Sequence, residues 1–96
     1  MSAAQQFRKK PVTVEAVLVT DALRAAARAW HDLPSWLVAA YDRGDALFAR
    51  DAVHLYRGTV VAGRGDWLVR DVDGAIIRCS GEAFAATYVS SDQERG

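Results

Sequence analysis

The pattern of apolar and polar positions in the first half of the chain predicts one strand followed by two helices. Residues 12–19 begin with alternation and then become apolar on both faces, which is typical of a strand in the middle of a sheet. Residues 22–30 are rich in alanine, arginine and leucine, and Asp21 is placed to cap a helix there. Residues 34–43 predict a second helix, which opens on a proline and which Gly44 ends.

The second half of the chain predicts short strands joined by tight turns. The predicted strands cover residues 46–50, 53–56, 59–62, 67–71 and 75–79. Between the last two, Gly74 can supply the positive φ that a hairpin turn requires. Ser80 is expected to cap a single helical turn that reaches Phe84, and residues 87–89 predict a closing strand.

Together these elements predict an α+β fold in one small domain that covers residues 7–89. The sheet should be mainly antiparallel and strongly curved, with about 5–7 short strands and with the two helices inserted after the first strand. Residues 1–6 and 90–96 are polar and lack periodicity, so we expect both to be flexible tails.

The charge balance excludes several classes of function. The chain carries 12 Lys and Arg against 12 Asp and Glu, which gives a formal net charge of zero. Apolar residues make up 51% of the chain and charged residues 25%, as in ordinary globular proteins. A nucleic-acid binder that works by bulk charge is therefore not expected, and neither is an acidic tail protein or a low-complexity chain.

Cysteine usage indicates the compartment. Cys79 is the single cysteine, so no intramolecular disulfide can form, and a reducing cytoplasm is expected. The first residues do not resemble a signal peptide, and no stretch approaches the ~20 apolar residues of a membrane span. We therefore expect a cytoplasmic protein.

Two segments resemble known ligand loops but lack the residues that those loops need. Residues 58–65 have the glycine spacing of a phosphate-binding loop. Arg64 and Gly65, however, stand where the phosphate-binding lysine and the Mg²⁺-binding hydroxyl are required. Residues 71–74 look like the middle of a calcium loop, yet the first and last ligand positions are not acidic, so a hairpin turn is favoured.

The reactive side chains do not form a recognisable catalytic set. His31 and His54 are the only histidines, and no closely spaced partner ligands accompany them. Cys79 ends an apolar strand, where a buried and inert thiol is expected, although a dyad with one of the histidines remains an alternative. We therefore predict no enzyme activity, no catalytic residue, no metal site and no cofactor.

Tryptophan and arginine supply the predicted partner-binding residues. Interface hot spots are enriched in Trp, Tyr and Arg, and the chain is rich in aromatic residues for its size. Trp36 with Arg43, and Trp67 with Arg64 and Arg70, are the candidates for contact with a partner protein. Exposed strand edges also invite pairing, so a homodimer is a further expectation.

An alternative function is the binding of a small ligand or a nucleic acid on an arginine-lined face of the sheet. It requires four arginines of the second half of the chain to converge, namely Arg57, Arg64, Arg70 and Arg78. The alternative basic patch comprises Arg8, Lys9, Lys10, Arg57 and Arg78.

Several segments together resemble a known family. They are FRKKPV at residues 7–12, VEA at 14–16, LPSWL at 33–37, GDWLVR at 65–70 and ATY at 86–88, with Gly74, Cys79 and Phe84 between the last two. The set is similar to a family of small bacteriophage and prophage proteins with a KKPV-VEA start and a PGDW-(I/V)-R…G…C…F-ATY end. That family has no agreed activity. The resemblance implies an accessory phage or prophage product in the host cytoplasm, for which binding of a host or phage protein is the expected function.

Three segments depart from the pattern of that family. Arg64 stands where proline is usual, and residues 18–19 are Leu-Val where Gln-Trp is common. Residues 79–82 replace a longer polar stretch. The loss of the tryptophan implies that the surface it served is altered in this chain.

Overall fold

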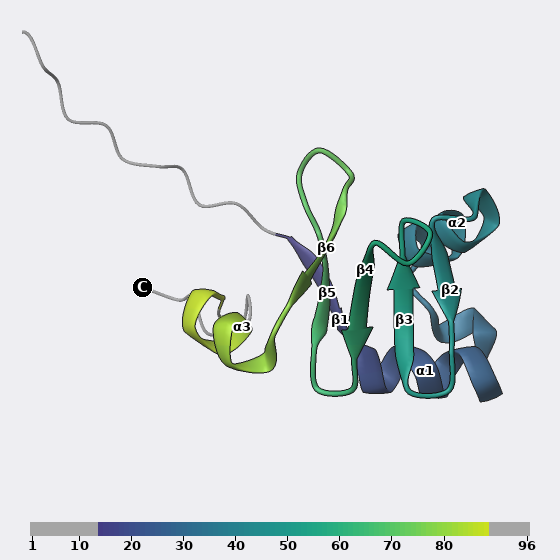
Figure 1. Ribbon diagram of the computed structural model, residues 1–96, viewed down its shortest axis with the longest axis horizontal. Helices are drawn as coiled ribbons and strands as arrows, with labels where there is room; N and C mark the ends of the chain where they lie inside the picture. Colours follow the sequence, from purple (N-terminus) through teal and green to yellow (C-terminus); the bar gives the residue numbers. More distant parts are fainter. Residues whose placement is uncertain (1–13, 89–96) are drawn as a thin grey trace, which may run out of the picture.

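The helices and strands follow one another largely in the predicted order. The computed structural model describes residues 14–88, so the predicted tails at 1–6 and 90–96 and the basic segment at 8–10 lie outside the described residues. The elements are β1 (Glu15–Leu18), α1 (Val19–Arg28), η1 (Trp30–Asp32), α2 (Ser35–Arg43), β2 (Ala46–Phe48), β3 (Ala52–Leu55), β4 (Val60–Gly63), β5 (Trp67–Arg70), β6 (Ile76–Cys79) and α3 (Gly81–Thr87) (Figure 1). None of the helices in this part of the chain is long and apolar enough to cross a membrane.

The strands form two antiparallel sheets of three strands each, with the orders β1-β5-β6 and β2-β3-β4. The α+β class and the antiparallel pairing are therefore confirmed, whereas the single, strongly curved sheet that we predicted is not found. The reason lies in β5, which pairs with β1 on one side and with β6 on the other. Both of its edges are occupied, so β5 cannot continue the sheet from β4.

The first helix begins earlier than predicted. Val19, assigned to the strand by its apolar pattern, is the first residue of α1, and its amide donates a 2.8 Å hydrogen bond to the carbonyl of Asp66. That contact with a distant turn ends the strand at Leu18, which therefore occupies the N-cap position predicted for Asp21. The Asp21 carboxylate instead lies in the first helical turn, where it still interacts favourably with the helix dipole.

The remaining helix ends follow from capping. Gly44 ends α2 in the left-handed conformation, with φ at 83°, as predicted. Gly74 has φ at 91° in the β5–β6 turn, which is confirmed as a hairpin turn, and the exposed tip of that turn carries Val72. The hydroxyl of Ser80 accepts a hydrogen bond from the amide of Ala83 at 3.2 Å and so caps α3.

The predicted closing strand at residues 87–89 is wrong. Thr87 is the last residue of α3 and Tyr88 is not in a strand, while Val89 lies outside the described residues. The helix runs past Phe84 because that ring stacks on Trp67 of β5, with centroids 4.1 Å apart and planes 5° apart. Tyr88 packs on the same ring at 5.0 Å.

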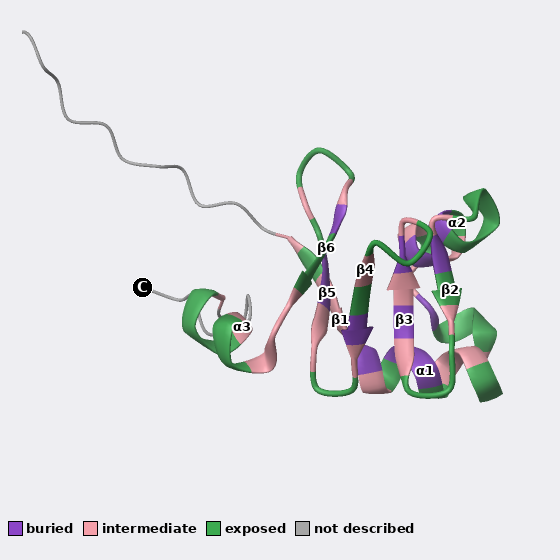
Figure 2. Ribbon diagram, viewed as in Figure 1, coloured by how far each residue is buried: buried purple, intermediate pink, exposed green. Residues whose placement is uncertain are grey.

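The core lies between the helices and one face of the sheet β2-β3-β4. α1 contacts β3 and β4, α2 contacts β2, and both helices lie behind these strands in Figure 1. The largest fully buried side chains are Leu37, Leu55, Leu68, Val19, Val53 and Val69 (Figure 2). The opposite face of the sheet carries a cross-strand row of Leu47, His54 and Val61. Its Leu47 and Val61 are exposed, so this sheet is buried on one side only.

One tyrosine joins the two sheets. Tyr56 follows β3 with a positive φ of 52°, which is rare for a residue with a side chain. Its hydroxyl accepts a hydrogen bond from the amide of Ile76 at 2.9 Å and donates one to the carbonyl of the same residue at 3.2 Å. Because Ile76 is the first residue of β6, this pair of bonds ties the end of β3 to the other sheet.

Candidate functional site

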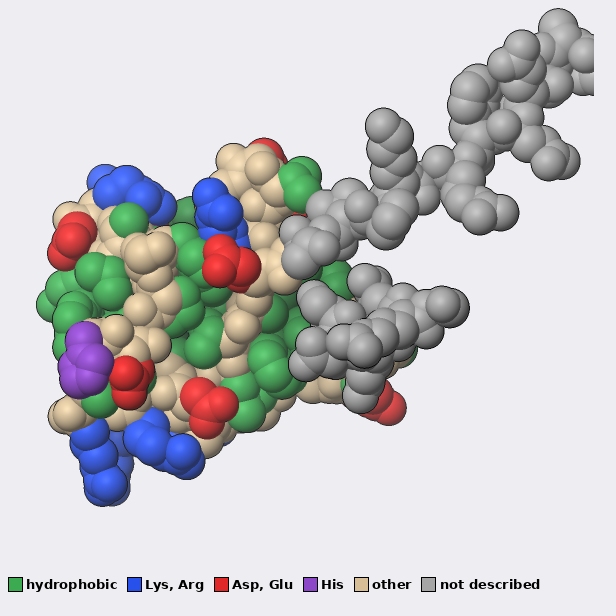
Figure 3. Space-filling model, turned by 180° about the vertical axis from the view of Figure 1, so that it is seen from behind, with side chains coloured by type: hydrophobic (Ala, Val, Ile, Leu, Met, Phe, Trp, Pro, Cys, Tyr) green, Lys and Arg blue, Asp and Glu red, His purple; other side chains and the backbone are tan. Residues whose placement is uncertain are grey.

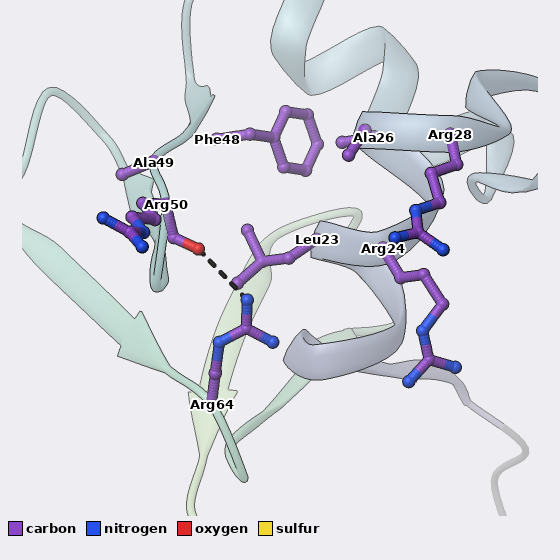
Figure 4. Close-up of a pocket in the computed structure, with 9 residues that line it drawn as sticks. Leu23, Arg24, Ala26, Arg28, Phe48, Ala49, Arg50 and Arg64 are labelled. Atoms are coloured by element: carbon purple, nitrogen blue, oxygen red, sulfur yellow. Dashed lines mark hydrogen bonds between the residues drawn. The ribbon is translucent and has the colours of Figure 1, made fainter.

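A hollow walled by four arginines lies between α1 and two turns of the strand region. Its volume is about 600 Å³, which is within the range of small-molecule sites. The charged walls are Arg24, Arg28, Arg50 and Arg64, and Leu23, Ala26 and Phe48 supply apolar surface (Figure 4). We call this hollow the arginine pocket.

Three separate stretches of sequence build the arginine pocket. Arg24 and Arg28 are four residues apart on α1, so they project from the same side of that helix. Phe48 is the last residue of β2, and Arg50 follows it in the turn to β3. Arg64 comes from the turn between β4 and β5. The strand pairing of β3 with both neighbours brings these two turns toward α1.

The guanidinium of Arg64 is held in place by two hydrogen bonds. Its Nε donates to Asp51 Oδ1 at 3.1 Å, and its Nη2 donates to the carbonyl of Arg50 at 3.2 Å. Figure 4 shows the group reaching toward Leu23, with the second bond drawn as a dashed line. These contacts fix the orientation of the group and leave Nη1 available to a ligand.

Positive charge exceeds negative charge around the arginine pocket. Arg64 pairs with Asp51 at 3.1 Å, and Arg24 pairs with Asp21 at 3.7 Å. Arg28 and Arg50 form no ion pair with any residue of the described range 14–88. The charges of Arg28 and Arg50 are therefore not neutralised by a direct ion pair, although Asp32 lines a neighbouring hollow together with Arg28. No carboxylate lines the arginine pocket itself among the described residues, which makes the pocket attractive to anions.

An exposed group of aromatic rings adjoins the arginine pocket and shares Phe48 with it. The Trp30 ring lies 5.0 Å from that of Tyr41 and 5.5 Å from that of Phe48, in edge-to-face arrangements. Tyr41 and Phe48 are 5.8 Å apart. Trp30 and Tyr41 remain 39% and 42% exposed. We call these three residues the aromatic cluster.

Three of the five predicted partner-binding residues meet in another hollow. Trp36, Arg43 and Arg70 line a space of about 570 Å³ together with Glu15, from β1. Arg43 Nε also donates a 3.1 Å hydrogen bond to the Asp45 carboxylate. The Trp36 indole is half-buried, and its Nε1 has no hydrogen-bond partner among the described residues. We call this space the Trp36 pocket.

The other two predicted residues are placed elsewhere. Trp67 is half-buried under Phe84, and Arg64 lines the arginine pocket. The four arginines of the alternative sheet-face site do not line a common hollow, since Arg70 is in the Trp36 pocket and Arg78 pairs with Asp66 at 2.8 Å.

The remaining members of the alternative basic patch have no shared surface that the structure describes. Arg57 is exposed in the turn after β3, with φ at 60°. Arg8, Lys9 and Lys10 lie outside the described residues.

Asp66 has a structural role of the kind that its turn position predicts. Burial alone would raise the pKa of this carboxyl group. The hydrogen bond from Arg78 Nε, that from the Gly63 amide at 3.0 Å and the charge of Arg78 outweigh burial and lower the pKa. The carboxylate therefore stays ionised while it holds the β4–β5 turn against β6.

The reactive side chains are dispersed among the elements. Cys79 is a half-buried free thiol at the end of β6. His31 is exposed in η1, with Nε2 3.4 Å from an Asp32 oxygen, and His54 lies on the outer face of β3. Within residues 14–88, no three His, Cys, Asp or Glu side chains are grouped in a way that could hold a metal ion.

Sequence reasoning missed most of the arginine pocket and the exposed part of the aromatic cluster. One signal was available: the four-residue spacing of Arg24 and Arg28. Trp30 falls inside the predicted helix, so its exposure in η1 had no sequence signal. The arginine spacing could not show that Arg50 and Arg64 face the same space, because those residues come from two turns that meet only through strand pairing.

Comparison with known proteins assigns this chain to no family. No protein-family model, no curated protein and no solved structure matches the chain. The resemblance to phage and prophage proteins therefore stays a prediction.

Proposed function

We propose that this chain is a non-enzymatic binding module that docks a host or phage protein through the aromatic cluster. In keeping with the phage resemblance, it would act as an accessory phage or prophage product in the host cytoplasm. The partner would offer an apolar side chain to the rings of Trp30 and Tyr41 and an acidic residue to the neighbouring arginines.

The observation that supports this proposal is the exposure of two packed aromatic rings. Trp30 and Tyr41 are about two-fifths exposed although they contact each other and Phe48. Rings held in this way lose little conformational entropy on binding, and Trp, Tyr and Arg dominate interface hot spots. The surface on the helix side also displays hydrophobic side chains between margins that carry both basic and acidic groups (Figure 3).

Charge favours an acidic partner segment beside the apolar contact. Arg28 and Arg50 border Phe48, the ring that the arginine pocket and the aromatic cluster share. Neither arginine is paired with a carboxylate of the described residues. The Trp36 pocket, which three of the predicted partner-binding residues line, would form a second docking point on another side of α2.

Co-purification from a bacterial lysate, followed by affinity measurement with the purified partner, tests the proposal. Trp30→Ala and Tyr41→Ala should each weaken binding about tenfold or more, as expected of hot-spot truncations. Ile77→Ala is the matched control, because Ile77 is 41% exposed, like Tyr41, but lies on β6 in the other sheet.

The outcomes are distinct. The aromatic cluster is supported as the docking surface if one protein co-purifies in stoichiometric amount with the Ile77→Ala variant but not with Trp30→Ala or Tyr41→Ala. A partner captured equally by all three variants would overturn it. Sedimentation of the purified chain measures whether it forms a homodimer. A second copy of the chain on the aromatic cluster, in place of a foreign partner, would also contradict the proposal.

A further inference from the structure

We propose that the arginine pocket binds a small phosphate monoester whose alcohol part is aromatic. The site shares Phe48, Arg28 and Arg50 with the surroundings of the proposed docking surface, but its ligand is a small molecule that needs no partner protein, so the two proposals are tested separately. The proposal combines the charge of the pocket, the fixed guanidinium of Arg64 and the apolar surface inside the hollow.

The charge of the pocket matches a dianion. Arg24, Arg28, Arg50 and Arg64 line the space, and two of them form ion pairs among the described residues, Arg24 with Asp21 and Arg64 with Asp51. No carboxylate lines the hollow among the described residues. A phosphate monoester carries about −1.5 to −2 charges at neutral pH, which is close to the excess positive charge of two.

The donor geometry suits phosphate oxygens. Guanidinium groups bind phosphate through paired N–H donors, and a preoriented group loses less entropy on binding. Arg64 is preoriented by its bonds to Asp51 Oδ1 and to the Arg50 carbonyl, so its free Nη1 faces the ligand in a fixed position. Arg28 reaches the same space from α1, on the opposite wall (Figure 4).

The apolar surface selects a ligand with an aromatic body. Leu23 and Phe48 point into the hollow in Figure 4, and Ala26 lies beside them on α1. A ring packed on Phe48 gains both apolar burial and an aromatic contact. The volume of about 600 Å³ accommodates a phosphate and one ring together.

Phenyl phosphate is the probe for the test, with amide chemical shifts of the isotope-labelled full chain as the readout at low ionic strength. Saturable shifts are expected at residues 24–28, 48–50 and 64. Arg28→Ala and Arg50→Ala should each weaken binding about threefold to tenfold, because Arg28→Ala removes a charge-assisted contact and Arg50→Ala removes a neighbouring positive charge. The effect should fall as salt is added.

Three controls make the result decisive. Arg70→Ala, in the Trp36 pocket, should leave the affinity unchanged. Inorganic phosphate should bind about threefold or more weakly than phenyl phosphate, because it lacks the ring. Phenol should give no saturable shift, because it lacks the charge. Arg28 and Arg50 are exposed, so their replacement by alanine leaves the buried core unchanged. The amide spectra of the two variants show directly whether the fold is kept.

Three results would overturn the proposal: shifts scattered over all exposed arginines, equal affinity for inorganic phosphate, and equal weakening by Arg70→Ala. None of them bears on protein docking, which Trp30→Ala and Tyr41→Ala test with a different ligand. Failure of one proposal is therefore distinguishable from failure of the other.

Discussion

At the scale of single residues, Gly81 shows how closely two turns approach each other. It is the first residue of α3, and a Cβ placed there would lie 2.8 Å from the carbonyl oxygen of Gly65. That distance is too short for any side chain, so the missing Cβ is what allows α3 to start beside the β4–β5 turn. The requirement comes from close approach, since no positive φ occurs at Gly81.

Gly81→Ala should therefore destabilise the fold by about 1–3 kcal/mol, because backbone on both sides must move to relieve the overlap. Gly63→Ala is the matched control: its Cβ would meet open space, so a change within about 0.5 kcal/mol is expected. Urea unfolding of both variants measures the difference. Equal free energies of unfolding for the two variants would contradict this account.

At the scale of elements, the connection between the two sheets depends on the Tyr56 hydroxyl. Tyr56→Phe removes both of its hydrogen bonds to Ile76 and should cost about 1–3 kcal/mol, because a partly buried amide is left without a partner. Hydrogen exchange at the Ile76 amide should become faster. Tyr41→Phe is the control, since the Tyr41 ring is exposed, and it should change stability by less than about 0.5 kcal/mol. An unchanged exchange rate at Ile76 would argue against the connection.

The elements themselves were largely predictable, whereas both ends of α1, the short η1 helix and the C-terminal segment around α3 were not. Gly44, Gly74 and Ser80 act through local geometry, so their roles could be read from sequence. The start of α1 depends on a hydrogen bond from Val19 to Asp66, 47 positions further along the chain by numbering, and local propensity contains no such information. The closing strand failed for the same reason, because stacking of Phe84 on Trp67 extends the helix.

At the scale of the whole molecule, the sheet β2-β3-β4 is buried on one face and open on the other. Leu55→Ala should cost about 2–5 kcal/mol, because Leu55 is fully buried beneath the helices. Leu47→Ala is the same substitution at a side chain that is 55% exposed, and a change within about 0.5 kcal/mol is expected. Thermal and urea unfolding compare the two. Similar losses would mean that the outer face is also covered.

The same asymmetry limits what sequence could say about the site. Trp36 and Trp67 were the tryptophans predicted to contact a partner, yet both are half-buried. Trp30 is the exposed one, because it lies in the short η1 helix beyond the packed part of α1. Pockets assembled from a helix and two turns depend on the complete arrangement of the chain.

The tip of the β5–β6 turn has a practical use. Val72 is 74% exposed there, and in Figure 1 this turn points away from α1 and from the turn between β2 and β3. Exposed tips of this kind tolerate inserted residues. An affinity handle placed beside Val72 would tether every molecule to a sensor chip in one orientation, with the arginine pocket directed toward the flowing solution.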